Sequence, residues 1–574
     1  MKRALLLSIG GLLTLSSAWA VALASPESLL PPGFERPKAR PGAAAAPGGT
    51  STPVVQPLPG AAGAAGKAVA APAGTRLPSL REIEAMSPDE LDELLGLKPK
   101  YDIPGAARRS LKQVGVLAEY EGGLPAASLA LQSGQLVQAV LDRNKGQLVS
   151  RWGHILLRRA LASRLDAPAG MNPADFTASR AALLVRMGEG AAARAVVQDV
   201  DAGNYNPALT QAAIESYALT ADITGICPVI AVQGGVRKDA DWRVLRAICA
   251  AFQGDGASGM AQLERLEREG AWQKIDMLLA RKYAGAAGKS RQAVKIEWDG
   301  VSNITPWRFA LTTAVGLEPP ASLMEDAPVR FAYATATAPM VGLEARAKAA
   351  DRAAATGILS SAAMVDLYAQ IYAQDDISGA WATSSETLRE AYVAASEADR
   401  LAAIRSLWDG AGDAQARYSR QVLTAYAAAR LPAGDSLAPY TGDLVASMLT
   451  AGLDRNAMRW LSQVEEGSLG WAQLVLVNPL RPAAVTAGAL DSFHDADESD
   501  QYRKSRFLVA GLAGLGRVDT GVANDFAAQV GVDLTRKTRW TRLIDQAADV
   551  NNQALVVLLA GVGMQGDGWD KMTS

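Results

Sequence analysis

Residues 172–197 read NPADFTASRAALLVRMGEGAAARAVV, and this stretch decides the expected fold. Asn172 followed by Pro173 predicts a helix start, because the Asn side chain can accept hydrogen bonds from free backbone N–H groups and Pro needs no donor at the first helical position. Apolar residues then recur with helical spacing at Phe176, Leu183, Leu184 and Met187. Gly188 can adopt the left-handed conformation that ends a helix, and Ala193 is small enough for the next helix to cross closely. The stretch therefore predicts a helical hairpin.

The same features recur along the chain. Further helix starts are predicted at Ser79, Ser87, Asn206 and Thr305. Ala or Gly follows Gly by five residues at Gly134/Ala139, Gly188/Ala193, Gly254/Gly259, Gly452/Ala457 and Gly516/Gly521. Chance is the alternative explanation of this second pattern, because the chain holds 53 glycines. Alternation typical of strands is almost absent, and residues 294–298 are its best example.

These patterns predict an all-α protein, built as a right-handed α-solenoid of stacked helical hairpins. Residues 79–317 would form the N-terminal part of this helical-repeat body and residues 318–574 its C-terminal part. The turn at residues 187–195 resembles the turn between the two helices of a tetratricopeptide repeat. From about residue 105 onward the chain is similar to degenerate helical-repeat proteins and to the superhelical domain of soluble lytic transglycosylases. The resemblance implies a helical solenoid that holds protein or peptide partners, and it assigns no specific residues.

Residues 1–24 have the order of a secretory signal peptide. Lys2 and Arg3 supply positive charge, an apolar core follows, and small residues end at two sites that predict cleavage after Ala20 or Ala24. An uncleaved membrane anchor is the alternative, but the apolar core is shorter than the ~20 residues that a spanning helix needs. We therefore expect a periplasmic or secreted protein that has no stable transmembrane segment after cleavage.

Residues 25–78 differ in composition from the rest of the chain. They contain 11 of its 28 prolines, interleaved with Ala, Gly and Thr. Such a segment cannot bury enough apolar surface to offset the entropy cost of ordering, so it predicts a disordered tether. The tether would space the helical body from a membrane or cell wall, or it would be a passive tail.

The charge balance narrows the class of partner. The chain has 57 Lys and Arg against 59 Asp and Glu, which gives a net charge of −2. No overall field attracts nucleic acid or an anionic membrane. We therefore expect no nucleic-acid partner, and the helical-repeat resemblance implies a protein or peptide partner in the cell envelope.

No motif for catalysis, cofactors or metals rises above chance in this sequence. His154 is interpreted as a satisfied helix residue, and the acidic stretch around His494 as a solvated loop, since it fails the EF-hand pattern. Residues 285–290 resemble a phosphate-binding loop, but Tyr283 stands where that motif requires Gly. Glu215-Ser216 lacks the segment that follows the catalytic Glu-Ser of lytic transglycosylases. We expect a non-enzymatic scaffold or adaptor without cofactor or metal. The alternative is a diverged envelope glycan hydrolase with a lytic-transglycosylase-like superhelical body.

The two cysteines predict a disulfide between Cys227 and Cys249. Export would place both thiols in an oxidising compartment. A turn is expected at residues 234–239, and residue 238 lies halfway between the cysteines, so the two would face each other across an antiparallel helical hairpin. Two buried, reduced thiols are the alternative.

Three tryptophans are candidate anchors for a partner. Trp307, Trp408 and Trp460 each lie beside a charged residue, which is compatible with exposure on a concave helical surface. The alternative is that all three belong to the core.

Overall fold

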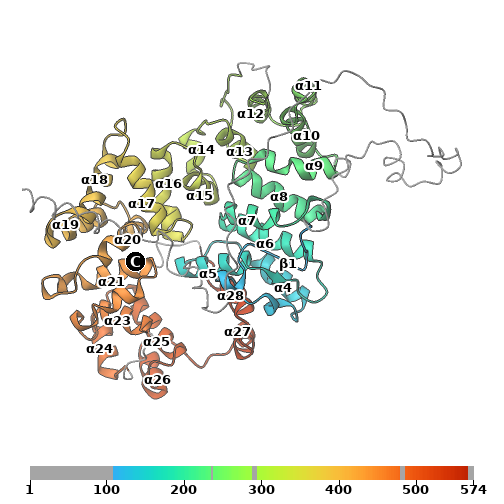
Figure 1. The fold of residues 1–574 in the computed structure, drawn as a ribbon. Helices are drawn as coiled ribbons and strands as arrows, with labels where there is room; N and C mark the ends of the chain where they lie inside the picture. The colour runs from blue at the N-terminus through green and yellow to red at the C-terminus, as the bar shows by residue number, and fades with distance from the viewer. Residues whose placement is uncertain (1–107, 234–236, 288–293, 479–484, 567–574) are drawn as a thin grey trace, which may run out of the picture. The chain divides into compact units, whose positions relative to one another are not determined.

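The computed structural model describes residues 108–233, 237–287, 294–478 and 485–566. Helices dominate these residues, as Figure 1 shows, and the predicted all-α fold is confirmed. The predicted signal peptide at residues 1–24, the tether at residues 25–78 and the helix starts at Ser79 and Ser87 lie outside the described residues. No helix within the described part of the chain is long and apolar enough to cross a bilayer.

The first half of the described chain holds a small sheet and ten α-helices. Strand β1 (Gln113–Val114) pairs antiparallel with β2 (Leu165–Asp166). The 3₁₀ helices are η2 (Glu119–Glu121), η3 (Ala126–Leu129), η4 (Ala202–Asn204) and η5 (Ile223–Ile226). The α-helices are α4 (Gly134–Arg143), α5 (Arg151–Ala162), α6 (Pro173–Met187), α7 (Gly190–Gln198), α8 (Pro207–Leu219), α9 (Cys227–Gln233), α10 (Ala240–Phe252), α11 (Gly256–Arg268), α12 (Lys274–Gly285) and α13 (Pro306–Ala314). Residues 294–298 form no strand despite their alternation.

The second half is helical throughout its described residues. Its 3₁₀ helices are η6 (Asp435–Tyr440), η7 (Leu461–Gln463) and η8 (Asp500–Tyr502). Its first α-helices are α14 (Ala321–Glu325), α15 (Val329–Thr337), α16 (Leu343–Thr356), α17 (Ser361–Tyr372), α18 (Ala380–Val393), α19 (Glu397–Asp409), α20 (Ala414–Ala429) and α21 (Thr441–Thr450). The remaining ones are α22 (Asp454–Met458), α23 (Leu469–Val477), α24 (Ala487–Asp495), α25 (Arg503–Gly514), α26 (Thr520–Gln529), α27 (Arg539–Asp549) and α28 (Gln553–Gly563).

The helix starts predicted from residues before Pro are confirmed where the structure describes them. The Asn172 side chain accepts a hydrogen bond from the Ala174 N–H at 2.8 Å, and α6 begins at the following Pro. Asn206 and Thr305 cap α8 and α13 in the same way. Each side chain satisfies a backbone donor that has no partner within its own helix.

The predicted glycine turns are confirmed at four of five positions. The left-handed glycines are Gly188 (φ 81°), Gly254 (φ 103°), Gly452 (φ 72°) and Gly516 (φ 62°). At Gly259 an added Cβ would lie 2.7 Å from the Ala247 carbonyl oxygen, so α11 crosses α10 as closely as the pattern predicted. The prediction is wrong at Gly134, because this residue is the first of α4 and no α-helix ends there.

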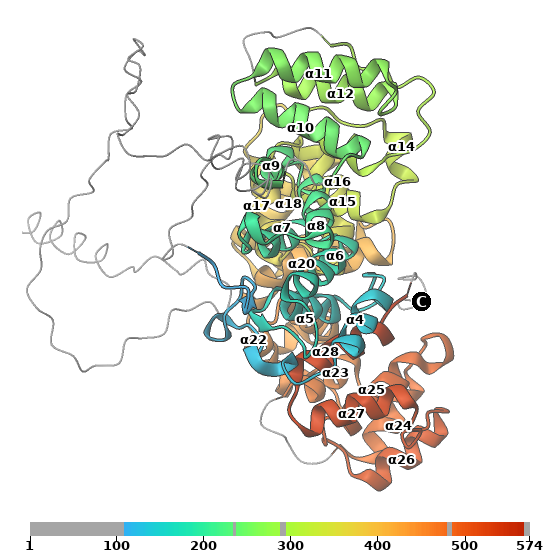
Figure 2. The same ribbon diagram turned by 90° about the vertical axis from the view of Figure 1, so that its right-hand side faces the viewer.

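Helices that follow one another in the chain pack in pairs, such as α10 with α11, α15 with α16 and α20 with α21. Contacts also join distant segments, and α28 packs against α4 and α5 in both views (Figures 1 and 2). The largest apolar core accordingly includes Leu555 and Leu558 of α28 together with Leu141 and Leu157. A solenoid repeat touches only its neighbours, and this contact is of another kind, so the right-handed solenoid stays a prediction.

Arginine side chains repeatedly bind the C-terminal ends of other helices. Such helix ends leave up to four carbonyl groups without an intrahelical partner, and the planar guanidinium carries five N–H donors. Examples are Arg180 to Leu161 and Ser163, Arg186 to Leu141 and Asn144, Arg459 to Ala429, and Arg517 to Val475. Lysine has no comparable fork of donors, so these contacts give arginine a structural role in the packing of the helices.

Candidate functional site

A cavity of about 430 Å³ lies between α13, α14, α15 and α16, and we call it cavity A. Its volume is in the range of ordinary ligand pockets, roughly 300–1,000 Å³. Much of its lining is apolar and comes from Phe309, Leu317, Met324, Ala345 and Ala349. The cavity therefore offers an apolar floor to a side chain or small group from outside.

Charged side chains complete the lining of cavity A. Lys348 and Arg352 lie one turn apart on α16, while Glu318 and Glu325 come from the segments before and within α14. All four residues are exposed to solvent. Neither Lys348 nor Arg352 forms an ion pair with any residue that the structure describes. Their charges are therefore free to pair with a bound anion.

A second cavity of about 420 Å³, cavity B, adjoins cavity A at the N-terminal end of α16. The two cavities share Glu318 and Ala345 as lining residues. Cavity B adds Glu344 and Asp376, and neither Lys nor Arg lines it. The electrostatic potential in cavity B is therefore negative, and cavity B lies beside the two basic side chains of cavity A.

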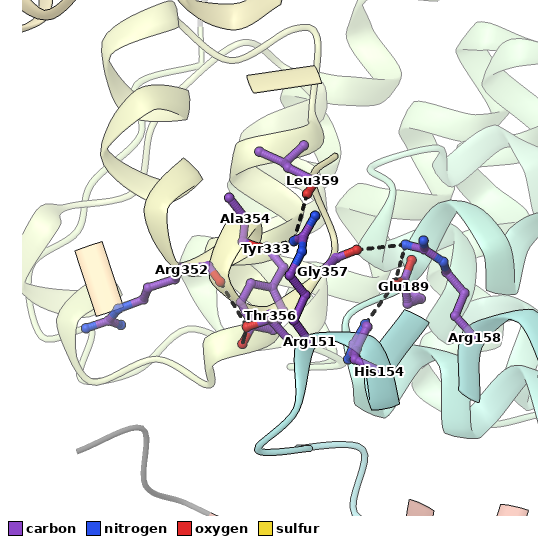
Figure 3. Close-up of polar contacts among 10 residues, drawn as sticks. All are labelled: Arg151, His154, Arg158, Glu189, Tyr333, Arg352, Ala354, Thr356, Gly357 and Leu359. Carbon is purple, nitrogen blue, oxygen red and sulfur yellow. Dashed lines mark hydrogen bonds and ion pairs between the residues drawn. The ribbon is translucent and has the colours of Figure 1, made fainter. Parts of the chain in front are cut away.

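Arg151 of α5 holds the far end of α16. Its guanidinium Nη1 donates hydrogen bonds to the carbonyls of Ala354 and Leu359, the latter at 3.2 Å (Figure 3). Its Nε donates to the Thr450 carbonyl at 3.1 Å. Arg151 is only 5% exposed. Burial lowers its pKa to about 10, so the side chain stays charged at neutral pH. These bonds provide donors for the carbonyls of Leu359, just beyond α16, and Thr450, at the end of α21, whereas the Ala354 carbonyl also accepts from the Gly357 N–H.

His154 and Arg158 form a second part of this polar cluster. His154 Nε2 and Arg158 Nη1 each lie 2.8 Å from Oε1 of Glu189, and Arg158 also donates to the Gly357 carbonyl (Figure 3). The interpretation of His154 as a satisfied helix residue is confirmed for Nε2, whereas Nδ1 has no partner among the described residues. The ring is fully buried, so it cannot reach a substrate in this conformation and its role here is structural.

Helix α16 connects this cluster to cavity A. Thr356 donates to the Arg352 carbonyl at 2.9 Å, and Tyr333 Oη lies 3.0 Å from the same Thr356 hydroxyl. Burial raises the pKa of Tyr333, which keeps the phenol protonated. In Figure 3 the Arg352 side chain is directed away from His154 and Glu189. Hydrogen bonds in the last turns of α16 thus hold its backbone in place, while Lys348 and Arg352 line the cavity from the preceding turns.

The carboxylates of cavity A lie in a solvent-exposed environment. A general acid needs an apolar, water-excluding environment that keeps its carboxyl group protonated at neutral pH. Glu318 and Glu325 are both exposed to solvent. Glu215, the residue that was compared with the catalytic Glu of lytic transglycosylases, lies on α8. It is half-buried and accepts a hydrogen bond from Gln211.

The three predicted tryptophan anchors lie elsewhere. Trp408 is 2% exposed and donates to Thr424 Oγ1 at 2.8 Å, and Trp460 is 0% exposed. The anchor prediction is therefore wrong for both, because each indole fills the core, as the alternative stated. Trp307 is half-buried, and its Nε1 donates to Asp241 at 3.1 Å. None of the three lines cavity A.

The predicted cysteine pairing is confirmed. The sulfur atoms of Cys227 and Cys249 are 2.01 Å apart, and the Cα atoms are 5.5 Å apart. They join the first residue of α9 to the last turn of α10, in the geometry that a disulfide requires. Part of the connecting turn, residues 234–236, lies outside the described residues.

The acidic stretch around His494 is more ordered than a solvated loop. Asp497 is 7% exposed and accepts hydrogen bonds from the backbone N–H and hydroxyl groups of Ser499 and Ser505. The solvated-loop interpretation is therefore wrong for Asp497, because this carboxylate holds the start of α25. Among the described residues no group of three His, Cys, Asp or Glu side chains could hold a metal ion.

Lys348 and Arg352 could not be recognised as site residues from the sequence. They follow Glu344 at intervals of four, which on a helix indicates an ordinary solvated face. These two residues line a cavity because α13 and α14 border the same space, and these helices lie some thirty residues earlier in the chain. No family model, curated protein or solved structure matches this chain.

Proposed function

We propose that this chain is a non-enzymatic, exported scaffold that holds a protein or peptide partner of the cell envelope. In this proposal a segment of the partner enters cavity A. The observation that carries the proposal is the pairing of an apolar floor with two basic side chains, Lys348 and Arg352, that have no ionic partner among the described residues. An apolar pocket with a few convergent polar groups is the usual form of a binding site.

The polar cluster around Arg151 supports the proposal. It fixes the end of α16 through the carbonyls of Ala354, Gly357 and Leu359. A helix held in this way presents its side chains in one arrangement, so binding loses less conformational entropy. Cavity A would therefore recognise its partner with little rearrangement of the backbone.

Two features favour export. Residues 1–24 have the order of a secretory signal peptide, and the Cys227–Cys249 pairing is of the kind that persists in oxidising compartments. The predicted solenoid of helical hairpins would supply the frame for the cavity, and residues 25–78 the tether.

A photo-reactive amino acid at Glu325, an exposed rim residue of cavity A, tests the proposal in living cells. The matched control carries the same amino acid at Leu131, which is 92% exposed and does not line the cavity. We expect irradiation to yield a discrete covalent adduct from position 325 and none of the same mass from position 131. Adducts of equal yield at both positions, or no adduct at 325, would contradict a binding role for cavity A.

The charge of the cavity provides a second control on the same measurement. Replacing Lys348 and Arg352 together by Glu should abolish the adduct at position 325, since both side chains border the cavity. The double replacement of Lys504 and Lys112, two exposed residues outside the cavity, should leave it unchanged.

A further inference from the structure

Three charged residues follow one another along a single line of α16. Glu344, Lys348 and Arg352 are spaced by four residues, so they lie on successive turns of the same helix face. All three are exposed to solvent. Glu344 lines cavity B, whereas Lys348 and Arg352 line cavity A. The charge along this line therefore changes sign where the two cavities meet.

Other acidic residues line both cavities, since Glu318 is shared and Glu325 belongs to cavity A, so the basic side chains of the site are those of Lys348 and Arg352. Glu318 and Asp376 line cavity B with Glu344, so a cation is favoured there. In cavity A, Lys348 and Arg352 favour an anion, and the apolar floor that contains Phe309 lies beside them. The two cavities share Ala345 and Glu318 as lining residues, so they lie next to each other along α16.

We infer that the segment entering these cavities is a bipolar, extended peptide. Its basic side chain pairs with the acidic group of cavity B, its acidic side chain pairs with Lys348 and Arg352, and an apolar residue between them occupies the floor of cavity A. This inference rests on the proposed function and adds the chemical class of the partner to it.

The spacing of the charges favours a peptide over other ligands. At 1.5 Å per residue, Lys348 and Arg352 lie roughly 6 and 12 Å beyond Glu344 along the helix axis. An extended peptide spans about 3.3 Å per residue, so its two charges would be two to four residues apart. A lipid with one anionic headgroup would leave the acidic residues of cavity B without a partner, and a polyanion would be repelled by them.

Four dye-labelled tetrapeptides test the inference by fluorescence anisotropy with the purified full-length chain. The bipolar probe is Lys-Leu-Ala-Glu-amide with the dye on its N-terminal α-amine, and the others carry Lys at both ends, Glu at both ends or Gln at both ends. Exposed ion pairs are individually weak, so two of them should favour the bipolar probe over the Gln probe by roughly tenfold. Equal affinities for the bipolar and Gln probes would overturn the inference.

A charge reversal gives the sharper comparison. In the Lys348→Glu/Arg352→Glu variant both cavities are acidic, so the probe with Lys at both ends should become the tightest ligand and the bipolar probe should weaken by roughly tenfold. An unchanged melting temperature would show that the variant folds, as expected for two exposed residues. An unchanged order of probe affinities in this variant would also overturn the inference.

The outcomes separate this inference from the proposed function. A covalent adduct at Glu325 in cells together with equal affinities for all four probes would refute the bipolar peptide and leave the binding role intact. Failure of the adduct would refute the binding role itself.

Discussion

Arg151, the first residue of α5, donates a hydrogen bond of 3.1 Å from Nε to the carbonyl of Thr450, the last residue of α21. The two residues are 299 positions apart in the chain. The same guanidinium donates to Ala354 and Leu359 at the end of α16. One buried side chain thus joins three helices, and one of them carries the basic residues of cavity A.

Replacing Arg151 by Ala should destabilise the protein strongly. The change removes the Arg151 donors of the Leu359 and Thr450 carbonyls and one of the two donors of the Ala354 carbonyl, which should lower the free energy of unfolding by about 3 kcal/mol. Arg151→Lys should cost less but not be neutral, since one ammonium group cannot reproduce the planar fork. Urea unfolding measures both effects. Arg268→Ala at the exposed end of α11 is the control and should stay within about 0.5 kcal/mol. An Arg151→Ala effect no larger than that of the control would contradict the role given to this residue.

Gly188→Ala should reveal the packing of the α6–α7 turn against α15. Gly188 has φ 81°, and an added Cβ would lie 2.4 Å from Cδ2 of Tyr333. Gly170 has a similar φ of 76° but no neighbouring atom within 4 Å. Both replacements carry the cost of a left-handed Ala, about 1 kcal/mol, and only Gly188→Ala adds a steric clash. We expect it to cost about 2 kcal/mol more than Gly170→Ala in the free energy of unfolding. Equal effects would show that Tyr333 does not contact this turn.

Features set by neighbouring residues could be predicted from the sequence. Asn172 and Asn206 precede Pro and cap their helices as expected, since capping involves only residues two or three positions away. The turn at Gly188 and the pairing of Cys227 with Cys249 are equally local, the cysteines being 22 residues apart. At Gly134 the pattern failed, because the segment before it contains a 3₁₀ helix instead of an α-helix that a glycine could end.

Features set by tertiary packing could not be predicted. Trp408 lies beside Asp409 on α19, where adjacent positions point to different sides, so a charged neighbour does not indicate exposure. Trp460 lies in the turn between α22 and η7 and is buried although Arg459 precedes it. Arg151 finds its partners more than 200 residues away. Cavity A depends on how α13, α14, α15 and α16 pack, and of these helices the sequence predicted only the start of α13 at Thr305.

Removal of the disulfide should destabilise the protein, and neither cysteine lines cavity A. Cys227→Ala with Cys249→Ala should lower the free energy of unfolding by about 3 kcal/mol, the size expected for a loop of this length in the chain-entropy model. The wild-type melting temperature should fall on addition of dithiothreitol, and that of the variant should not. Alkylation of two thiols in the unreduced, denatured protein would refute the bond.

Asp497 should make the stability depend on acid pH. Although partial burial opposes ionisation, hydrogen bonds from Ser499 and Ser505 outweigh it and lower the pKa of this carboxyl group. A carboxyl group whose pKa is lower in the folded state stabilises the protein above its unfolded pKa, about 3.9, and this contribution is lost as the pH falls through the folded value.

The matching measurement compares the wild type with Asp497→Asn by urea unfolding at several pH values. At pH 7 the variant should be less stable by about 2 kcal/mol, because it loses charge-assisted hydrogen bonds at the start of α25. The difference should shrink as the pH falls below about 4, where the wild-type carboxylate becomes protonated. A difference that is constant from pH 7 to pH 2.5 would contradict this assignment.

The central claim is that cavity A binds a partner through Lys348 and Arg352. The most direct test is calorimetric titration of the partner captured at Glu325 into the wild-type chain and into the Lys348→Glu/Arg352→Glu variant, with the melting temperature of each recorded. We expect the affinity of the variant to be at least tenfold lower at an unchanged melting temperature, because both residues are exposed and border the cavity. Equal affinities for the two chains would contradict the claim.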